Sequence, residues 1–335
     1  MLEKLFHQVS KLSEEDKQSF FLWINSQIKK PEQVTHLTAI EIRKESLEKE
    51  GLLCPHCKSS ALYGHGTFSG RKRYRCKTCK KTFNELSGTS LDRLHLKDKW
   101  EAYLACMVQG KSLRATAKEV GIDLRTSFKW RHRILSSLNE VGCSHMEGII
   151  EADETFFLFS EKGDKKLTRK PRKRGGKASR DGMNQEHVNV IVASDRKGAN
   201  AMNVGNRGVI TKKAIQKAIG KWIVKPGNIL CSDAHRTFQG YAKEKNMPHK
   251  MLYARKKQYV VDKIYHIQNV NNIHGRLKKF LLNFNGVATK YLQNYVNYFK
   301  AFTQFKDLQE LTYRILSNND VYYGTMKTNL HYYTT

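Results

Sequence analysis

The stretch Gly148–Phe157, GIIEADETFF, decides how the rest of the chain is interpreted. It is an apolar run typical of a β-strand, and it carries Glu151, Asp153 and Glu154 in its second half. Because strand side chains alternate between faces, Glu151 and Asp153 share one face and Glu154 points to the other. A carboxylate in such a run is costly to bury unless it is paired or binds a cation. The alternatives are therefore a functional strand and an edge strand with a solvated acidic face.

A second apolar run, Asn228–Asp233 (NILCSD), also ends in an aspartate. Two aspartates on two strand ends of one sheet are a natural clamp for two metal ions in phosphoryl transfer. The second run therefore favours the functional interpretation, with Asp153 and Asp233 as the paired ligands.

The net charge of +29 arises from 60 Lys and Arg residues against 31 Asp and Glu residues. This excess exceeds what solubility needs and indicates a polyanionic partner, most simply nucleic acid. An anionic membrane surface is the other candidate, but the chain has no basic amphipathic anchor, long apolar run or secretory signal. We therefore expect a cytoplasmic, nucleoid-associated protein without a membrane partner.

The strongest local motif is a pair of CxxC knuckles, and seven cysteines in total fit a reducing compartment better than disulfides. Thiolates at this spacing, with a β-hairpin between the pairs, can close one structural Zn²⁺ site that has no room for an activated water. Four incidental buried cysteines are a poor alternative in so basic a segment. The predicted ligands of this zinc ribbon are Cys54, Cys57, Cys76 and Cys79.

Residues 95–138 have the pattern of helices, and Gly121 separates a first helix from a basic second one that Asp123 can cap. A small residue in the first helix, the glycine turn and the basic second helix are typical of a helix-turn-helix. Trp130 and Ile134 are expected in the core. An ordinary helical pair is the alternative. The predicted base-reading positions are Arg125, Thr126, Ser127 and Lys129.

The loop Glu161–Asn184 contains the basic run KKLTRKPRKRGGKASR, which follows the acidic strand directly. Such a run is usually a solvated loop. Its place beside the candidate ligands also suggests an arm that tracks DNA phosphates. The predicted contacts in it are Arg172, Lys173 and Arg174.

From Gly148 onward the pattern predicts three strands in hairpin order, then helix, strand, helix, strand and helix. This is the order of a ribonuclease H-like domain with a mixed sheet, which would bring Asp153 beside Asp233. The predicted strands after the first are His187–Ser194, Ala199–Val204, Asn228–Ser232 and His249–Ala254; the predicted helices are Thr211–Lys221, Arg236–Asn246, one from Gln268, Tyr291–Phe302 and Leu308–Leu316.

The fold class expected is therefore multi-domain α+β, with two small modules before an α/β catalytic domain. Residues 1–30 are predicted to form a helical hairpin. The predicted divisions are an N-terminal helical region (1–50), a zinc ribbon (51–85), a helix-turn-helix region (86–145), a catalytic domain (146–316) and a C-terminal tail (317–335).

With these residues in hand, the chain resembles the insertion-sequence transposases that have an N-terminal zinc ribbon, a helix-turn-helix and a DDE-type domain, in the ISXO-like branch. The resemblance covers roughly residues 50–300. The motifs that carry it are CPHC with CKTC, ADETFF, SDAHRTF, and HIQNVNNIHGRLKKF followed by FNGVATKYLQNYVNYF. Together these motifs are specific, whereas each aspartate motif alone is weak.

The resemblance implies a third catalytic residue on the helix after the fifth strand. Relatives that use glutamate carry it five residues after a histidine and seven before a lysine; measured from His266 and Lys278, this position is Asn271. The implied set is Asp153, Asp233 and Asn271, with Lys278 following. His274, further along the same helix face, is the rival ligand. Mg²⁺ and Mn²⁺ prefer oxygen ligands, which favours the asparagine.

The resemblance implies a Mg²⁺-dependent (or Mn²⁺-dependent) DNA transposase with two metal ions, which binds terminal inverted repeats and cuts and joins DNA strands. A synaptic complex that holds two DNA ends implies a homodimer or a larger assembly. Two rivals stay open. One is a non-catalytic DNA-binding regulator, including an inactive or domesticated copy. The other is a nuclease of the same fold without strand transfer.

Overall fold

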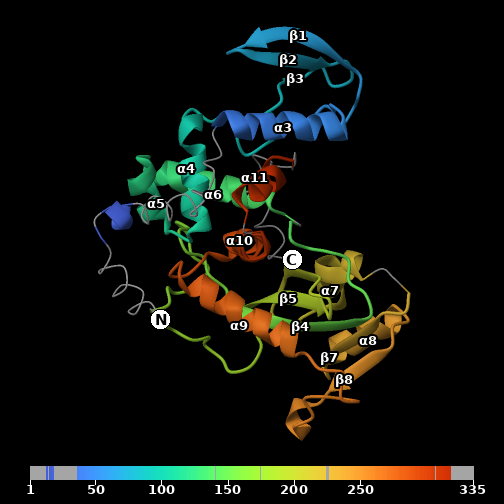
Figure 1. Cartoon of the computed structure of the whole chain (residues 1–335). Coiled ribbons are helices and arrows are strands. Elements are labelled where there is room, and N and C mark those ends of the chain that lie inside the picture. Colours follow the sequence, from blue (N-terminus) through green and yellow to red (C-terminus); the bar gives the residue numbers. More distant parts are fainter. Residues whose placement is uncertain are drawn as a thin grey trace.

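The computed structural model describes residues 13, 15–18, 36–139, 141–173, 175–223, 226–305 and 307–317. The helical hairpin expected over residues 1–30 and the tail expected from residue 317 lie almost entirely outside these residues. The described chain forms a small three-stranded sheet, a group of helices and a larger helix-covered sheet, arranged from top to bottom in Figure 1.

The small sheet lies at one end of the molecule, next to helix α3 (His36–Glu50) (Figure 1). It is antiparallel in the order β1-β2-β3. Its strands are β1 (Leu62–Phe68), β2 (Arg71–Cys76) and β3 (Thr82–Phe83). The β1–β2 hairpin connects the two CxxC pairs, as the spacing predicts.

A short 3-10 turn (Lys97–Lys99) leads into the helices α4 (Trp100–Val108), α5 (Leu113–Val120) and α6 (Leu124–Ser137). Gly121 ends α5 in the left-handed conformation, with φ of 66°, which glycine adopts without strain. Asp123 then caps α6, because its Oδ1 accepts from the N–H groups of Arg125 at 2.7 Å and Thr126 at 3.4 Å. Trp130 and Ile134 are buried, as expected.

The large sheet is mixed and has the strand order β6-β5-β4-β7-β8. The first three strands pair antiparallel as consecutive hairpins, whereas β7 is parallel to both β4 and β8. The strands are β4 (Ile149–Leu158), β5 (His187–Asp195), β6 (Asn200–Arg207), β7 (Ile229–Asp233) and β8 (His249–Leu252). Their bounds agree with the predicted strands to within a few residues.

Helices cover both faces of this sheet (Figure 1). On one face, α7 (Lys212–Ile219) packs on β5 and β6, and α8 (Arg236–Glu244) packs on β7. On the other face, α9 (Gln268–Leu282) packs on β4 and β5, and α10 (Leu292–Gln304) packs on β6. The last described helix, α11 (Leu308–Ser317), contacts α3. Short 3-10 turns lie at Gly220–Trp222, Ala254–Lys256 and Thr289–Tyr291.

Strand alternation determines which side chains meet which helices. On β5, Val190 and Val192 join the cluster that includes α9 and α10, whereas Ile191 and Ala193 join the cluster of α7 and α8. On β4, the same alternation sends Glu151 and Asp153 toward α9, as predicted for two residues that share a face.

The α4–α6 helices pack directly on the helices of the large sheet. His132 of α6 is buried against Tyr291, with ring centroids 4.0 Å apart, and its Nδ1 lies 3.1 Å from Asn294 Nδ2. The ring of Phe128 is tilted against that of His132, with centroids 4.5 Å apart, and meets that of Tyr291 edge-on. These contacts join α6 to α10 and to the turn that precedes it.

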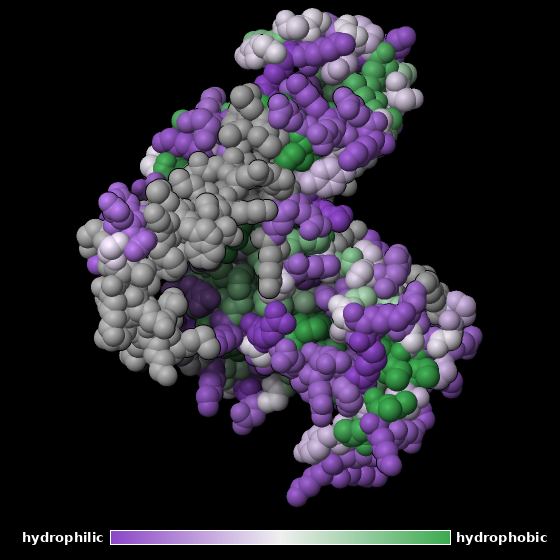
Figure 2. Space-filling model, in the orientation of Figure 1, coloured by the Kyte–Doolittle hydropathy of each residue, from purple (hydrophilic) through white to green (hydrophobic). Residues whose placement is uncertain are grey.

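Within the described parts of the chain, no helix is long and apolar enough to cross a membrane. In Figure 2 the visible face is largely hydrophilic.

Candidate active site

Asp153 and Asp233 lie on neighbouring parallel strands. Ile149 is opposite Ile229 and Glu151 is opposite Cys231, so the same register continued along β4 and β7 brings Asp153 level with Asp233. The sheet therefore brings together the two aspartates that the sequence paired.

The carboxylates here are crowded and partly buried. Burial, together with the charge of Asp233, raises the pKa of Asp153 to about 7. Burial raises the pKa of Glu154 to about 8, with further contributions from Asp153 and Asp233. The nearby Lys278 acts in the opposite direction on Asp153 but does not compensate. Negative charge on Asp153 and Glu154 is therefore poorly neutralised by the protein itself.

His274 of α9 is the side chain that the helix places closest to the first aspartate. Its Nδ1 lies 3.8 Å from Asp153 Oδ2, which is too long for a hydrogen bond, and the ring is buried with 7% of the residue exposed. Burial and the charge of Lys278 lower the pKa of His274 to about 4, so the imidazole is neutral at physiological pH. Its Nε2 is buried and has no hydrogen-bond partner among the described residues.

Asn271 and Lys278 lie on the same face of α9 as His274, one turn before and one turn after it. Both are exposed. The backbone N–H of Asn271 donates to Ile267 O at 3.0 Å; for its side chain, the described residues offer no hydrogen bond. The structure thus places the buried His274 beside Asp153 and the exposed Asn271 one turn away, toward solvent.

The donor set fits hard divalent cations. Carboxylate oxygens of Asp153 and Asp233 and the amide oxygen of Asn271 are ligands that Mg²⁺ and Mn²⁺ prefer. Oε2 of Glu154 is buried without a hydrogen-bond partner in the described chain. A cation held by Asp153 and Asp233 would offset the repulsion from Asp233 that adds to burial in raising the pKa of Asp153.

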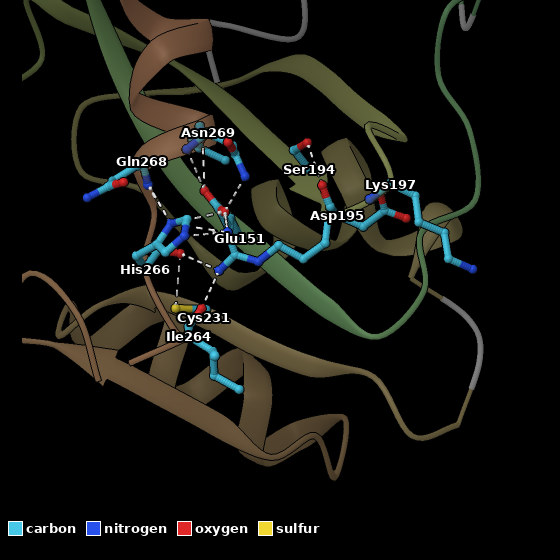
Figure 3. A network of polar contacts seen from close by, with 11 residues as sticks. Glu151, Ser194, Asp195, Lys197, Cys231, Ile264, His266, Gln268 and Asn269 are labelled. Atoms are coloured by element: carbon cyan, nitrogen blue, oxygen red, sulfur yellow. Dashed lines mark hydrogen bonds and ion pairs between the residues drawn. The ribbon is translucent and has the colours of Figure 1, made fainter. Parts of the chain in front are cut away.

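Glu151 is a functional candidate that the sequence did not assign. It is fully buried, and Figure 3 shows its carboxylate meeting the start of α9, where Asn269 and His266 lie. Asn269 donates to it from both its backbone N–H, at 2.9 Å, and its Nδ2, at 2.8 Å. Arg196, from the β5–β6 turn, forms an ion pair with the same carboxylate.

The four predicted zinc-ligand cysteines form one cluster in which all Sγ atoms lie within 4.8 Å of one another. Cys54 and Cys79 are 3.5 Å apart, and Cys57 and Cys76 are 3.6 Å apart. Tetrahedral zinc with Zn–S bonds of about 2.3 Å needs sulfurs ~3.8 Å apart. The cluster is compatible with a zinc site.

The predicted DNA contacts on α6 divide into two groups. Arg125 and Lys129 are exposed and Thr126 is half-buried at the start of the helix. Ser127 is buried, and its Oγ donates to Leu113 O at 3.0 Å. Its hydroxyl therefore joins α6 to α5 instead of facing solvent, which corrects the expectation that it contacts bases.

The predicted contacts in the basic loop also differ from one another. Arg172 is half-buried, pairs with Glu186 at 2.7 Å and donates to Phe159 O at 2.6 Å. It holds the loop against the sheet, which corrects the expectation of a free phosphate contact. Lys173 is exposed. Arg174 lies outside the described residues.

A groove of about 1350 Å³ runs beside the aspartate strand. Its lining includes the apolar Phe157 and Leu281 and cations from three elements, among them Arg114 of α5, Lys173 of the loop and Lys278 of α9. The groove thus extends from α5 to the part of α9 that carries Lys278.

Comparison with known proteins gives a family for part of the chain. Residues 145–301 match the family of the ISXO2-like transposase domain, which confirms the resemblance to insertion-sequence transposases drawn from the motifs.

An uncharacterized protein in the transposable element ISH50 of Halobacterium salinarum is 27% identical over 169 residues, which are 50% of this chain and 55% of that protein. The chain thus spans about half the length of this curated relative. Among solved structures, the pre-cleavage Mos1 transpososome is 10% identical, with a TM-score of 0.22 over 66% of this chain and 79% of its own. The mariner Mos1 paired end complex with Mg is 12% identical, with a TM-score of 0.21 over 66% and 78%.

Proposed function

We propose that this protein is the transposase of a bacterial-type insertion sequence, which binds the element's terminal inverted repeats, cuts the DNA there and joins the freed ends to a target. The observation that carries the proposal is the register of β4 and β7, which brings Asp153 and Asp233 level on adjacent parallel strands below α9. The strand order β6-β5-β4-β7-β8 supports a ribonuclease H-like catalytic domain.

In this proposal Asp153, Asp233 and Asn271 supply the oxygen ligands for two Mg²⁺ or Mn²⁺ ions. Bound there, the ions would lower the pKa of an attacking water and stabilise charge on the scissile phosphate. The three ligands come from β4, β7 and α9, so the packing of α9 on β4 controls whether the set is complete.

The other side chains have distinct proposed roles. His274 is neutral and packs against Asp153, so it fills the space behind this carboxylate without competing for hard cations. Lys278 is exposed at the groove, where its ammonium group can hold a DNA phosphate close to the aspartates.

DNA recognition is assigned to the N-terminal modules. The capped turn around Gly121 and Asp123 supports a helix-turn-helix in which α6 presents Arg125, Thr126 and Lys129 to base edges. The cysteine cluster would hold one structural Zn²⁺ and keep the small sheet folded. Lys173 and other loop cations would contact phosphates along the groove. Since two DNA ends must be held together, we propose that a homodimer or larger assembly acts.

An assay with labelled terminal-repeat duplex, Mg²⁺ and a target plasmid separates this function from its rivals. The proposal predicts cleavage at the repeat end and joining of that strand to the plasmid. Binding to the repeat without cleavage would instead identify a regulator, and cleavage without joining would identify a nuclease. Asp153→Asn should abolish both cleavage and joining. The matched control is Asp98→Asn, which removes the same charge at an exposed position outside the site and should leave both reactions unchanged.

A further inference from the structure

Helix α9 has no capping residue of its own. The residue before its first turn is Ile267, whose side chain cannot accept a hydrogen bond. The first N–H groups of a helix lack partners within the helix and need acceptors from elsewhere. At the other helix starts that follow Ser112, Asp123 and Thr211, a local side chain supplies the acceptor.

The acceptor for the first N–H groups of α9 is Glu151 of strand β4. Oε2 of Glu151 accepts from the N–H groups of Asn269 at 2.9 Å and Val270 at 3.2 Å. The N–H of Gln268 donates to Nδ1 of His266 at 3.3 Å, and the N–H of Asn271 begins the helical ladder by donating to Ile267 O. The opening N–H groups are thus all satisfied, two of them by a residue 118 or 119 positions earlier in the chain.

The second carboxylate oxygen of Glu151, Oε1, also has two partners. Oε1 accepts from Nδ2 of Asn269 at 2.8 Å and pairs with Nη1 of Arg196. Nη2 of Arg196 donates to Ile264 O at 2.8 Å, so the guanidinium also holds the segment that leads into α9. A buried carboxylate needs such a full set of partners, and here each partner belongs to the helix, its approach or the β5–β6 turn.

The bonds of Glu151 with Asn269, Val270 and Arg196 form a bridge between β4 and α9, two of the three elements that carry the proposed metal ligands. Asp153 is two residues from Glu151 on the same face of β4, and Asn271 is two residues from Asn269 on α9. Because a helix rises about 1.5 Å per residue, Asn271 lies within about one half turn of the anchored N–H groups. If the N–H groups of Asn269 and Val270 move relative to Glu151, Asn271 therefore moves by almost the same distance.

We infer that Glu151, supported by Arg196, is a positioning residue that sets α9 against β4 so that Asn271 meets the metal held by Asp153 and Asp233. The inference rests on the proposed function. It assigns Glu151 no contact with metal or DNA, because its carboxylate is buried and its oxygens are occupied by the helix start and by Arg196.

The test uses the full-length, zinc-loaded chain and Fe²⁺ as a probe of the site. With ascorbate and hydrogen peroxide, bound Fe²⁺ produces hydroxyl radicals that cut the polypeptide next to the ligands, so the cut positions report which residues surround the metal. In the unmodified protein we expect cuts near Asp153, Asp233 and Asn271. In Glu151→Gln, the cut near Asn271 should weaken about tenfold relative to the other two, as for loss of an outer partner of a metal ligand.

Two further variants separate positioning from simple capping. Arg196→Gln leaves the helix-start bonds of Glu151 intact and should weaken the Asn271 cut less than Glu151→Gln does. Adding Ile267→Asp to Glu151→Gln supplies a local cap without a link to β4, and the Asn271 cut should stay weak. Recovery of the cut in this double variant would mean that Glu151 only caps the helix, and the inference would be wrong.

The matched control is Glu147→Gln, which removes a carboxylate four residues earlier, outside the bridge, and should leave the cut pattern unchanged. An unchanged ratio of cuts in both Glu151→Gln and Arg196→Gln overturns the inference and leaves the proposed function intact. Absence of cuts at Asp153 and Asp233 in the unmodified protein overturns the metal site itself, and the inference with it. If Glu151→Gln does not fold, the better-exposed Arg196→Gln decides alone.

Discussion

Acid should loosen the contact between the α4–α6 helices and the large sheet through one histidine. His132 is buried between Phe128 and Tyr291 and lies 3.1 Å from Asn294. Burial, with a smaller contribution from the charge of Arg131, lowers the pKa of His132 from 6.5 to about 3. Above pH 6.5 the ring is neutral in both the folded and the unfolded chain, so it contributes no pH dependence there.

As the pH falls below 6.5, the unfolded chain binds a proton at this position and the folded chain does not, so stability is lost progressively down to about pH 3. At about pH 5, which is roughly 1.5 pH units below 6.5, the cost is about 2 kcal/mol, since each pH unit between the two pKa values corresponds to about 1.4 kcal/mol. A glutamine at position 132 keeps a hydrogen-bonding side chain but does not titrate. His132→Gln should therefore lose about 2 kcal/mol less stability than the unmodified protein between neutral pH and about pH 5.

The assay is urea unfolding followed by tryptophan fluorescence at the two pH values. Other buried histidines, such as His274, titrate equally in both proteins and cancel in the comparison. His95→Gln, at an exposed position, is the control and should behave like the unmodified protein. If His132→Gln loses as much stability on acidification as the unmodified protein, the burial argument is refuted.

Two further predictions concern metal and DNA. Cys76→Ser should release one Zn²⁺ per chain and unfold residues 51–85, because binding energy is folding energy in such sites; zinc-free protein purified under reducing conditions would contradict the ribbon. Arg125→Ala should lose about 1–3 kcal/mol of discrimination between terminal-repeat and random DNA. Changes in the basic run 165–177, such as Lys173→Ala, should instead weaken binding to all DNA and reduce the dependence of binding on salt concentration. Gel-shift titrations at several salt concentrations measure both effects, and equal weakening on repeat and random DNA would count against Arg125 as a base contact.

The strand pattern was sufficient to predict most of the large sheet. Alternation along Gly148–Phe157 correctly placed Glu151 and Asp153 on one face, because period-2 patterns depend only on local backbone geometry. The run ending in Asp233 was likewise a local apolar pattern, and it forms β7. Asp123 as the cap of α6 followed from the same kind of local chemistry.

The features that sequence reasoning missed depend on contacts between distant segments. Glu151 was recognised as costly to bury, but its partners Arg196 and Asn269 lie on other elements, and no short-range pattern points to them. The absence of a polar residue at Ile267 was the available indication that α9 needs an outside cap. Arg172 was grouped with a solvated basic run because its partner Glu186 comes only after the loop returns to β5.

The burial of Ser127 has a similar cause. Its position near the start of α6 suits a base contact, but the rotation of α6 against α5 turns its hydroxyl inward to Leu113 O. Helix rotation is set by the packing of Trp130 and Ile134 in the core, and a count of residues from the cap does not determine it. The prediction that α6 contacts base edges therefore rests mainly on Arg125 and Lys129, which are exposed.

The central claim is that Asp153 and Asp233, completed by Asn271, form the catalytic site. The most direct measurement is single-turnover cleavage of a labelled terminal-repeat duplex with Mg²⁺ by purified variants whose repeat binding and folding match the unmodified protein. Asp153→Ala and Asp233→Ala should abolish cleavage, and Asn271→Ala should come close to doing so. His274→Ala should keep substantial activity, because imidazole is a poor ligand for Mg²⁺.

Asn271→Glu should retain cleavage, since it restores the carboxylate of glutamate-bearing relatives. If His274→Ala is inactive while Asn271→Ala cuts normally, the third ligand is His274, the side chain that lies 3.8 Å from Asp153. If both Asp153→Ala and Asp233→Ala cut at the unmodified rate, the two aligned aspartates are not the catalytic site and the account is wrong.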